Sequence, residues 1–372
     1  MPSRRRASIA AAAAVAPLAL AYRFAVVYRT RAGVPRRRPP RFTPADFGLA
    51  YEEMAIPSRW GDLPGWFVPA RGGAPGPAVV LVHGWESARD RALPNIQFLH
   101  AAGFHCLVFD VRGHGANPAE ALPVSAGEFG ADAGAALDAA LRRPEVTHAA
   151  LFGHSMGGDG AILAAAADRR TAALVATSAP SDPQQLTRLT FRLAGLRFPD
   201  AVAHPLAWLT TRVYLRPRGH RVEDVSARVA IAQYEGPLLL AHGSADRVVP
   251  ISHLSRLTTA ATSARRRGGS APVEVLVVPN GTHSWLYEDE RYRRTVARFL
   301  AEALGGPYAP DDAADRAAAV DARRLPEGEA WFAAVTDAPG RLRTIGELSG
   351  AIRPVRPWAE PAAVEAAEPA GR

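Results

Sequence analysis

Six short apolar runs recur along the middle of this 372-residue chain, and each has the length of one buried strand. They are AVVLV (78–82), HCLVFD (105–110), HAALF (148–152), AALVAT (172–177), PLLLAHG (237–243) and VEVLVVP (273–279). Amphipathic stretches lie between or after them, near residues 89–102, 128–142, 156–168, 251–264 and 288–304. Strands that alternate with helices predict a parallel sheet with helices on both faces, because each right-handed crossover lays its helix over the sheet.

Two more strands are expected before these runs. LAYEEMAI (49–56) and LPGWFVPA (63–70) flank the turn-like SRWGD (58–62), which favours a hairpin. The predicted fold class is therefore α/β, with a mostly parallel central sheet of about eight strands.

One long interval, residues 178–236, breaks the alternation. It contains five prolines and several large apolar residues but no clear buried strand. We expect a helical cap insertion over the strand ends; the alternative is a long surface connection, which is uncommon at this length. The main domain is then 42–304. Residues 305–372 form a C-terminal extension, expected to be partly disordered, in which 329–348 are able to dock on the body.

The positive charge of the chain belongs to its first 41 residues. The net charge is +8, but residues 1–41 hold ten arginines and no acid, so the remainder is close to neutral. This distribution argues against nucleic-acid binding by the main domain. An uncharged run over 7–22, followed by arginines, predicts a membrane segment that keeps the domain after it on the cytoplasmic side. A signal peptide cleaved near Ala19–Ala21, giving an exported protein, and a soluble alanine-rich helix are the alternatives.

Cysteine and metal chemistry are not expected. Cys106 is the only cysteine, so no intramolecular disulfide can form, and it lies within an apolar strand where a thiol is usually a small hydrophobe. No histidine and carboxylate cluster has the spacing of metal ligands. We therefore expect neither metal nor cofactor.

Polar, glycine-rich turns follow five of the predicted strands. They are HGWE (83–86), VRGHG (111–115), GHSMGG (153–158), HGSADRVVP (242–250) and NGTHSW (280–285). Ligands meet open parallel sheets at the carboxyl ends of the strands, so these turns predict one site.

The turn around Ser155 joins a strand directly to a helix. Gly153 and Gly157 remove side chains that would collide at so sharp a bend, and the helix N-terminus suits a developing negative charge. The alternative is a glycine-rich turn with a bystander serine.

Ser155 follows the strand 148–152, Asp246 follows the last strand but one, and His283 follows the last strand. This order and the five turns resemble the α/β-hydrolase superfamily over about residues 48–303. The resemblance implies a Ser155 nucleophile, a His283 base and an Asp246 orienter, with Asp182 as a rival acid. It also implies an oxyanion hole from the Trp85 and Met156 N–H groups, on a turn shaped by His83 and Gly84.

The predicted activity is hydrolysis of carboxylic esters through a covalent acyl-enzyme, on a small-molecule or lipid ester. A small-peptide peptidase of the serine aminopeptidase type and a lipid acyl-hydrolase or thioesterase are the alternatives. The non-enzyme alternative is a catalytically dead, membrane-tethered binding module. Acyl length, oligomeric state and the role of Asp159, where relatives often have a small residue, stay open at this level.

Overall fold

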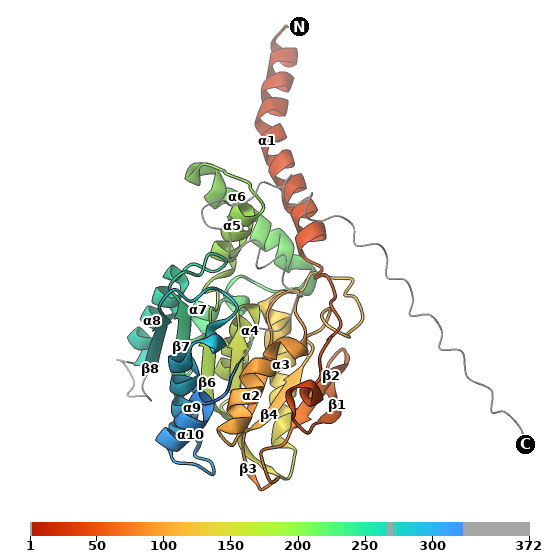
Figure 1. Cartoon of the computed structure of the whole chain (residues 1–372). Coiled ribbons are helices and arrows are strands. Elements are labelled where there is room, and N and C mark those ends of the chain that lie inside the picture. The colour runs from red at the N-terminus through yellow and green to blue at the C-terminus, as the bar shows by residue number, and fades with distance from the viewer. Residues whose placement is uncertain (1, 266–270, 272, 323–372) are drawn as a thin grey trace, which may run out of the picture.

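The central sheet has eight strands in a computed structural model that describes residues 2–265, 271 and 273–322 (Figure 1). Its strands are β1 (Glu52–Ser58), β2 (Gly61–Val68), β3 (Gly76–Val82), β4 (His105–Phe109), β5 (Val146–His154), β6 (Thr171–Thr177), β7 (Leu238–Gly243) and β8 (Val273–Val278). The strand order is β1-β2-β4-β3-β5-β6-β7-β8. β1 and β2 are antiparallel and β2 runs antiparallel to β4, whereas all pairs from β4 to β8 are parallel. The predicted fold class is confirmed.

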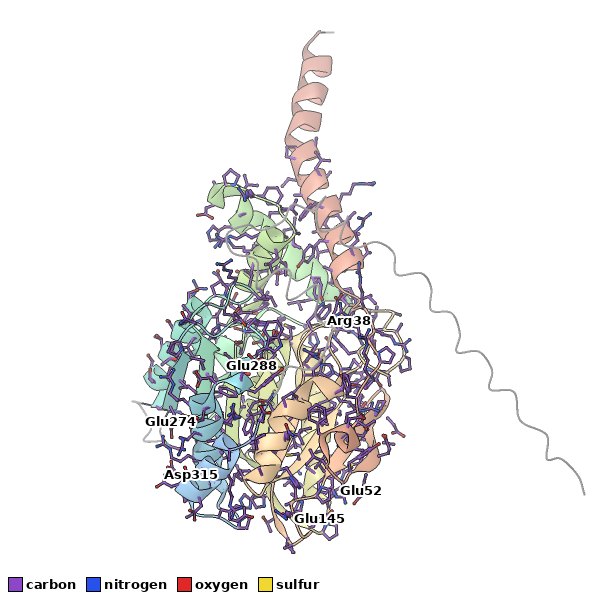
Figure 2. The ribbon with its side chains drawn as sticks, viewed as in Figure 1. Arg38, Glu52, Glu145, Glu274, Glu288 and Asp315 are labelled. Carbon is purple, nitrogen blue, oxygen red and sulfur yellow. The ribbon has the colours of Figure 1, made fainter. Side chains whose placement is uncertain are left out.

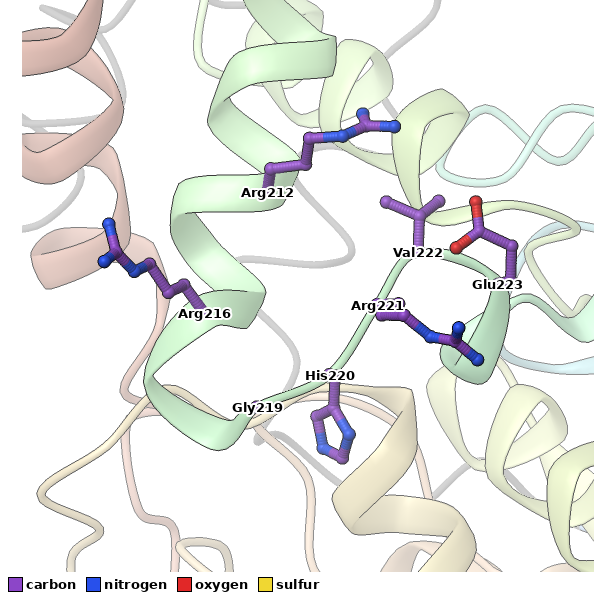
Figure 3. Close-up of a pocket in the computed structure, with 7 residues that line it drawn as sticks. All are labelled: Arg212, Arg216, Gly219, His220, Arg221, Val222 and Glu223. Carbon is purple, nitrogen blue, oxygen red and sulfur yellow. The ribbon is translucent and has the colours of Figure 1, made fainter.

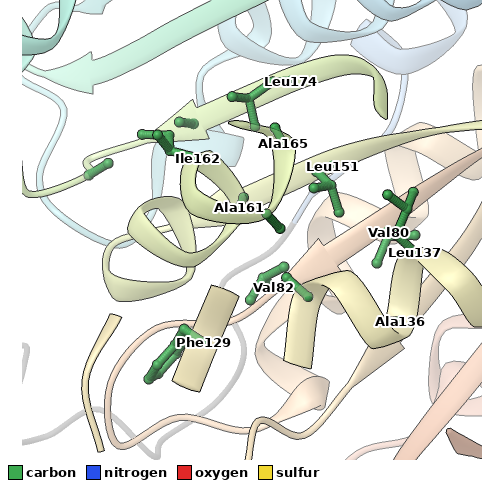
Figure 4. Close-up of a cluster of buried hydrophobic side chains, with 14 of the residues drawn as sticks. Val80, Val82, Phe129, Ala136, Leu137, Leu151, Ala161, Ile162, Ala165 and Leu174 are labelled. Carbon is green, nitrogen blue, oxygen red and sulfur yellow. The ribbon is translucent and has the colours of Figure 1, made fainter. Parts of the chain in front are cut away.

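Helices cover both faces of this sheet. The body helices are α2 (Leu93–Ala101), α3 (Ala126–Leu141), α4 (Met156–Ala167), α8 (Ser252–Arg265), α9 (Glu290–Leu304) and α10 (Pro310–Ala318), with single turns η1 (Pro44–Phe47), η2 (Arg89–Ala92) and η5 (Leu286–Glu288). Alternate strand residues point to opposite faces. Val80 and Val82 therefore pack with α3 and α4 in one apolar cluster, and Val79 and Leu81 pack with α2 and α9 in the other (Figure 4).

The interval 178–236 is helical. It contains α5 (Pro183–Leu193), α6 (Asp200–Leu215), η3 (Arg216–Arg218), η4 (Glu223–Val225) and α7 (Ala227–Ala230), all between β6 and β7. α5 and α6 stand above the body in Figure 1, on the same side as α1 (Pro2–Ala32). This interval is thus a helical cap, as predicted, rather than the alternative of a long surface connection.

The second half of α1 packs on the cap. The ring of Phe24 lies edge-on to Phe191 and Phe198, with centroids 5.5 and 6.0 Å apart. Tyr28 lies perpendicular to Phe191, at 5.6 Å, and its hydroxyl is hydrogen-bonded to Thr190 Oγ1 at 2.5 Å. The domain boundary expected after residue 41 is therefore not a break in the packing, because α1, which precedes it, contacts the cap.

Within the described residues, neither α1 nor any other helix combines the length and the apolar character needed to cross a bilayer. Membrane association through residues 1–41 stays a prediction. At the other end of the chain, α10 packs against α9 and α2, so the first part of the C-terminal extension belongs to the body. The docking segment 329–348 and the expected disorder near the C-terminus lie outside the described residues.

Candidate active site

Ser155 lies at the apex of the bend between β5 and α4, with φ +55° and ψ −125°. An L-residue adopts this conformation only under strain, and such residues are held by tight packing around them. A Cβ on Gly157 would lie 2.1 Å from the Val82 carbonyl oxygen, and one on Gly153 would lie 2.1 Å from the Gly157 oxygen. The flanking glycines are therefore required by close backbone approach.

Three side chains form a hydrogen-bonded relay at the carboxyl ends of the strands. His283, in the loop after β8, places Nε2 3.0 Å from Ser155 Oγ. Its Nδ1 lies 2.8 Å from Asp246 Oδ2, in the turn after β7. All three residues are buried. The structure thus brings together Ser155, His283 and Asp246.

The Asp246 carboxylate is fixed on both oxygens. Oδ1 accepts the N–H groups of Val248 and Val249 at 2.9 and 2.8 Å, which leaves Oδ2 for the His283 imidazole. His242 Nε2 is 3.3 Å from the same Oδ2. Burial alone would raise the pKa of Asp246, but the imidazoles of His283 and His242 outweigh burial and hold that pKa well below its usual range. Asp246 is therefore an anion at neutral pH.

The rival acid, Asp182, has a different partner. Its side chain accepts the N–H groups of Gln184 and Gln185 and so caps the N-terminus of α5.

The turn after β3 faces Ser155 across a narrow gap. A Cβ on Gly84 would lie 3.2 Å from the Ser155 Cβ, so only glycine lets the turn come this close. The Val111 N–H donates to His83 Nε2 at 3.0 Å, which leaves the Nδ1 proton to donate to the Gly84 oxygen at 2.8 Å. Burial lowers the pKa of His83 to about 4, so the ring is neutral and this tautomer is fixed.

Two N–H groups beside Ser155 have no acceptor within the described chain. Trp85 follows the Gly84 turn, and Met156 is the first residue of α4, where an N–H has no helical acceptor. These are the two donors that the sequence assigned to an oxyanion hole.

Arg112 and Asp110 lie two residues apart after β4, but each pairs with a different partner. Asp110 accepts the backbone N–H and side chain of Arg89, at 2.7 and 2.6 Å, and Arg112 pairs with Asp132 on α3. Asp110 and Asp132 are both buried, so their ion pairs with Arg89 and Arg112 fix the loop 110–117. His114 braces it too, through its Nδ1 and the Arg112 oxygen at 2.9 Å.

A cavity of about 1050 Å³ opens above the relay. Ser155 and His283 lie in its wall, which also includes the cap helices α5 and α6. Trp85 lines the cavity. Trp285, two residues after His283, packs in the apolar cluster around α2 and α9.

Asp159 also lines this cavity, one turn into α4. It is 4% exposed, and its Oδ1 has no hydrogen-bond partner among the described residues. Burial, followed by the nearby charge of Asp182, raises its pKa well above the usual value. Burial therefore favours the protonated, uncharged form of this side chain.

Sequence reasoning missed the N-terminal contribution to the cavity. Tyr28, Val34 and the segment 36–42 line it together with the cap. The arginines 36–38 suggested only the flank of a membrane segment. The aromatic residues at 24 and 28, one helical turn apart, were the available signal that one face of α1 is buried.

A second, smaller hollow of about 380 Å³ lies beyond the end of α6 (Figure 3). Its side chains include Arg221, which pairs with Asp224, and His220, which bonds Glu128. It lacks a nucleophile and lies away from the relay.

Comparison with known proteins gives consistent results. The family profile described as serine aminopeptidase, S33, matches residues 73–220. The chain is 31% identical over 244 residues to the uncharacterised protein Rv2307c of Mycobacterium tuberculosis, which covers 64% of this chain and 75% of that protein.

Two solved structures share the fold. The Pyrococcus furiosus esterase Pf2001 matches 73% of this chain and 98% of its own, with 22% identity and a TM-score of 0.57. The Pyrococcus horikoshii acylaminoacyl peptidase matches 73% of this chain and 45% of its own, with 18% identity and a TM-score of 0.53. With the parallel sheet and the serine turn at its edge, these similarities identify the chain as a member of the α/β-hydrolase superfamily and an enzyme of its esterase and peptidase branch.

Proposed function

We propose that this enzyme hydrolyses carboxylic esters through an acyl-enzyme on Ser155. The observation that carries the proposal is the unbroken relay from Ser155 Oγ through His283 to Asp246, at 3.0 and 2.8 Å. A serine hydroxyl becomes a nucleophile only when a base accepts its proton. His283 is placed to be that base, and Asp246 keeps the Nδ1 proton on the far side of the ring.

The reaction follows from this arrangement. As Ser155 Oγ attacks the ester carbon, its proton passes to His283 Nε2, and the carbonyl oxygen becomes an oxyanion. The N–H groups of Trp85 and Met156 receive that charge, and each such donor contributes about 3 kcal/mol to lowering the barrier. His283 then protonates the departing alcohol. Water attacks the acyl-enzyme with His283 again as base, which releases the acid and restores Ser155.

The charges in the cavity favour esters over the amino-terminal peptides that an aminopeptidase cleaves. A free α-ammonium group needs a carboxylate partner, and the acids in the cavity wall are Glu86, Asp90 and Asp159. Glu86 and Asp90 each accept a backbone N–H of the arginine segment, and burial raises the pKa of Asp159 well above its usual value. The surrounding arginines would repel an ammonium group.

A fluorophosphonate probe and a substrate panel test the proposal. We expect the probe to label the native protein but not Ser155→Ala. We expect hydrolysis of p-nitrophenyl acyl esters to fall by at least about 10⁴-fold in Ser155→Ala and in His283→Ala. Aminoacyl anilides should be poorer substrates than the esters. Folded native protein that neither reacts with the probe nor hydrolyses any ester would favour the binding-module alternative; efficient anilide cleavage would favour the peptidase.

A further inference from the structure

The wall of the catalytic cavity carries a strong excess of positive charge. Six arginines line it, namely Arg31, Arg36, Arg37, Arg38, Arg41 and Arg91. Only three acids do so: the carboxylates of Glu86 and Asp90, and the buried Asp159, whose pKa is raised well above its usual value by burial. Six arginines thus face these two carboxylates and one acid of raised pKa around one cavity.

Both of these carboxylates hold the backbone of the arginine segment. The Arg36 N–H donates to Glu86 Oε1 at 3.2 Å, and the Arg41 N–H donates to Asp90 Oδ2 at 2.8 Å. Glu86 directly follows Trp85, the proposed oxyanion donor. The segment 36–41 is therefore tied to the cavity mouth at two points, and one of them adjoins the reaction centre.

The preceding residues fix the segment from the other side. The Gly33 oxygen accepts the Val124 N–H at 2.8 Å, and Tyr214 donates its hydroxyl to the Val124 oxygen at 2.6 Å. With Tyr28 packed on the cap, the chain descends from α1 to the body in one defined path. Figure 2 labels Arg38 where this path reaches the body.

Guanidinium groups on this path are available at the surface of the cavity. Arg31, Arg36 and Arg37 are exposed and line it at the same time. A guanidinium group binds carboxylate or phosphate oxygens through paired N–H donors. The cavity wall also contains an apolar cluster of Leu186, Leu189 and Val249, and the Val249 N–H donates to Asp246 of the relay.

We propose that Arg36 and Arg37, helped by Arg31, form a subsite for an anionic group, so that the substrates are esters that carry a carboxylate or a phosphate. This inference rests on the proposed ester hydrolysis and names its substrate class. The apolar part of the substrate lies along the cap, its ester carbonyl lies at Ser155, and its anion lies at the mouth.

A matched pair of esters measures the subsite. p-Nitrophenyl hexanoate and the p-nitrophenyl half-ester of adipic acid have the same acyl length and differ by one terminal carboxylate. We expect the native enzyme to prefer the adipate ester in kcat/KM. In Arg36→Gln/Arg37→Gln this preference should fall at least about tenfold, which corresponds to about 1.4 kcal/mol. It should also fall as NaCl rises from 0.05 to 0.5 M, because salt screens exposed charges.

Two variants provide the controls. Arg36→Lys/Arg37→Lys keeps both charges and should retain most of the preference. Arg169→Gln removes the same charge from an exposed turn between α4 and β6, at the opposite end of the sheet, and should leave the preference unchanged. An equal preference in the native and Gln/Gln enzymes, at any salt concentration, would overturn the subsite.

A binding measurement separates this inference from the proposed reaction. Thermal shift of the Ser155→Ala protein by decanoate, compared with decanol, needs no catalysis. Stabilisation by decanoate that is lost with Arg36→Gln/Arg37→Gln supports the subsite even if the ester proposal fails. Equal shifts by both ligands overturn the subsite even if hexanoate is hydrolysed.

Vesicles distinguish the source of the anion. Phosphatidylcholine vesicles with and without phosphatidylglycerol are tested for protection of Ser155 from the fluorophosphonate probe. Arginine-dependent protection by the anionic vesicles alone indicates a lipid headgroup. Preference for the adipate ester without such protection indicates a soluble anionic ester. Either outcome supports the subsite.

Discussion

The relay and the wall above it are built in different ways. Ser155, Asp246 and His283 stand on turns that leave three parallel strands of one sheet, β5, β7 and β8, so the backbone ladder sets their spacing. The wall is assembled from α1 with the segment 33–42 that follows it and from the cap, which is distant from both in sequence and is joined to α1 by side-chain packing. The rigid sheet thus fixes the geometry of the relay. The residues that would select a substrate lie on elements outside the sheet, where the backbone is less constrained.

The largest effect on catalysis is expected from a change of Asp246, the acid of the relay. Asp246→Asn keeps the shape of the side chain but removes the charge that holds the His283 tautomer. We expect kcat for ester hydrolysis to fall by about 10³–10⁴-fold. Asp182→Asn is the matched control, because asparagine also caps helices, and it should change kcat by less than about threefold. If Asp182→Asn lowered kcat more than Asp246→Asn does, Asp182 would be the acid of the relay.

The next largest effect is expected from replacing Gly157, in the turn around Ser155, and it is an effect on stability. In Gly157→Ala the new Cβ would meet the Val82 and His83 oxygens at 2.1 and 2.4 Å, and neither backbone atom can move without shifting the sheet. We expect a loss of about 3 kcal/mol in the free energy of unfolding in urea.

Gly134→Ala in α3 is the control for that variant. A Cβ there would have no atom within 4 Å, so alanine should stabilise the helix by about 0.5–1 kcal/mol. Equal unfolding free energies for the two variants would show that the close approach around Ser155 is not a constraint.

These local constraints explain what the sequence could predict. Six of the eight strands were recognisable as apolar runs of five to seven residues separated by turns, and the first two were recognisable from the turn-like segment 58–62 between them. Ser155 and His283 could be assigned because each follows such a run. Asp246 was harder to choose, since Asp182 also follows a strand, and only the hydrogen bonds separate a relay acid from a helix cap.

The wall could not be predicted in the same way. The arginines 36–38 have no periodicity that reveals their partner, and the N–H contacts to Glu86 and Asp90 span about fifty residues of sequence. The pairing of Arg112 with Asp132 and the burial of Trp285 were missed for the same reason, because both depend on which helix packs over the loop. Sequence patterns report local geometry, and these contacts are tertiary.

A third prediction tests whether the wall acts independently of the relay. Phe24→Ala removes the ring that joins α1 to Phe191 and Phe198, and we expect α1 to detach from the cap more often. The change should cost about 1–3 kcal/mol of local stability, read as faster proteolysis within residues 33–42. kcat/KM should fall further for decanoyl esters than for acetyl esters, because only the longer acyl chain reaches the cap.

Leu18→Ala is the matched control on the same helix. Leu18 is 70% exposed, so its loss should alter proteolysis and kcat/KM very little. If Phe24→Ala lowers acetyl and decanoyl hydrolysis equally, the wall and the relay are coupled, and the contrast between the two regions fails.

The smallest effect concerns Asp159, which lies where the two regions meet. Its native pKa is raised by burial and by the charge of Asp182, so the folded protein retains a proton that the unfolded chain releases near pH 4. The stability that depends on this proton is complete below pH 4 and is lost as the pH rises toward the native pKa. An asparagine at position 159 cannot titrate. The free energy of unfolding of Asp159→Asn, measured in urea, should therefore rise relative to that of the native protein by about 1–2 kcal/mol between pH 5 and pH 8. Asp182→Asn removes the neighbouring charge and should make this pH dependence shallower. Parallel stability curves for Asp159→Asn and the native protein would mean that Asp159 is solvated through the cavity, and the cavity floor would then be polar rather than apolar.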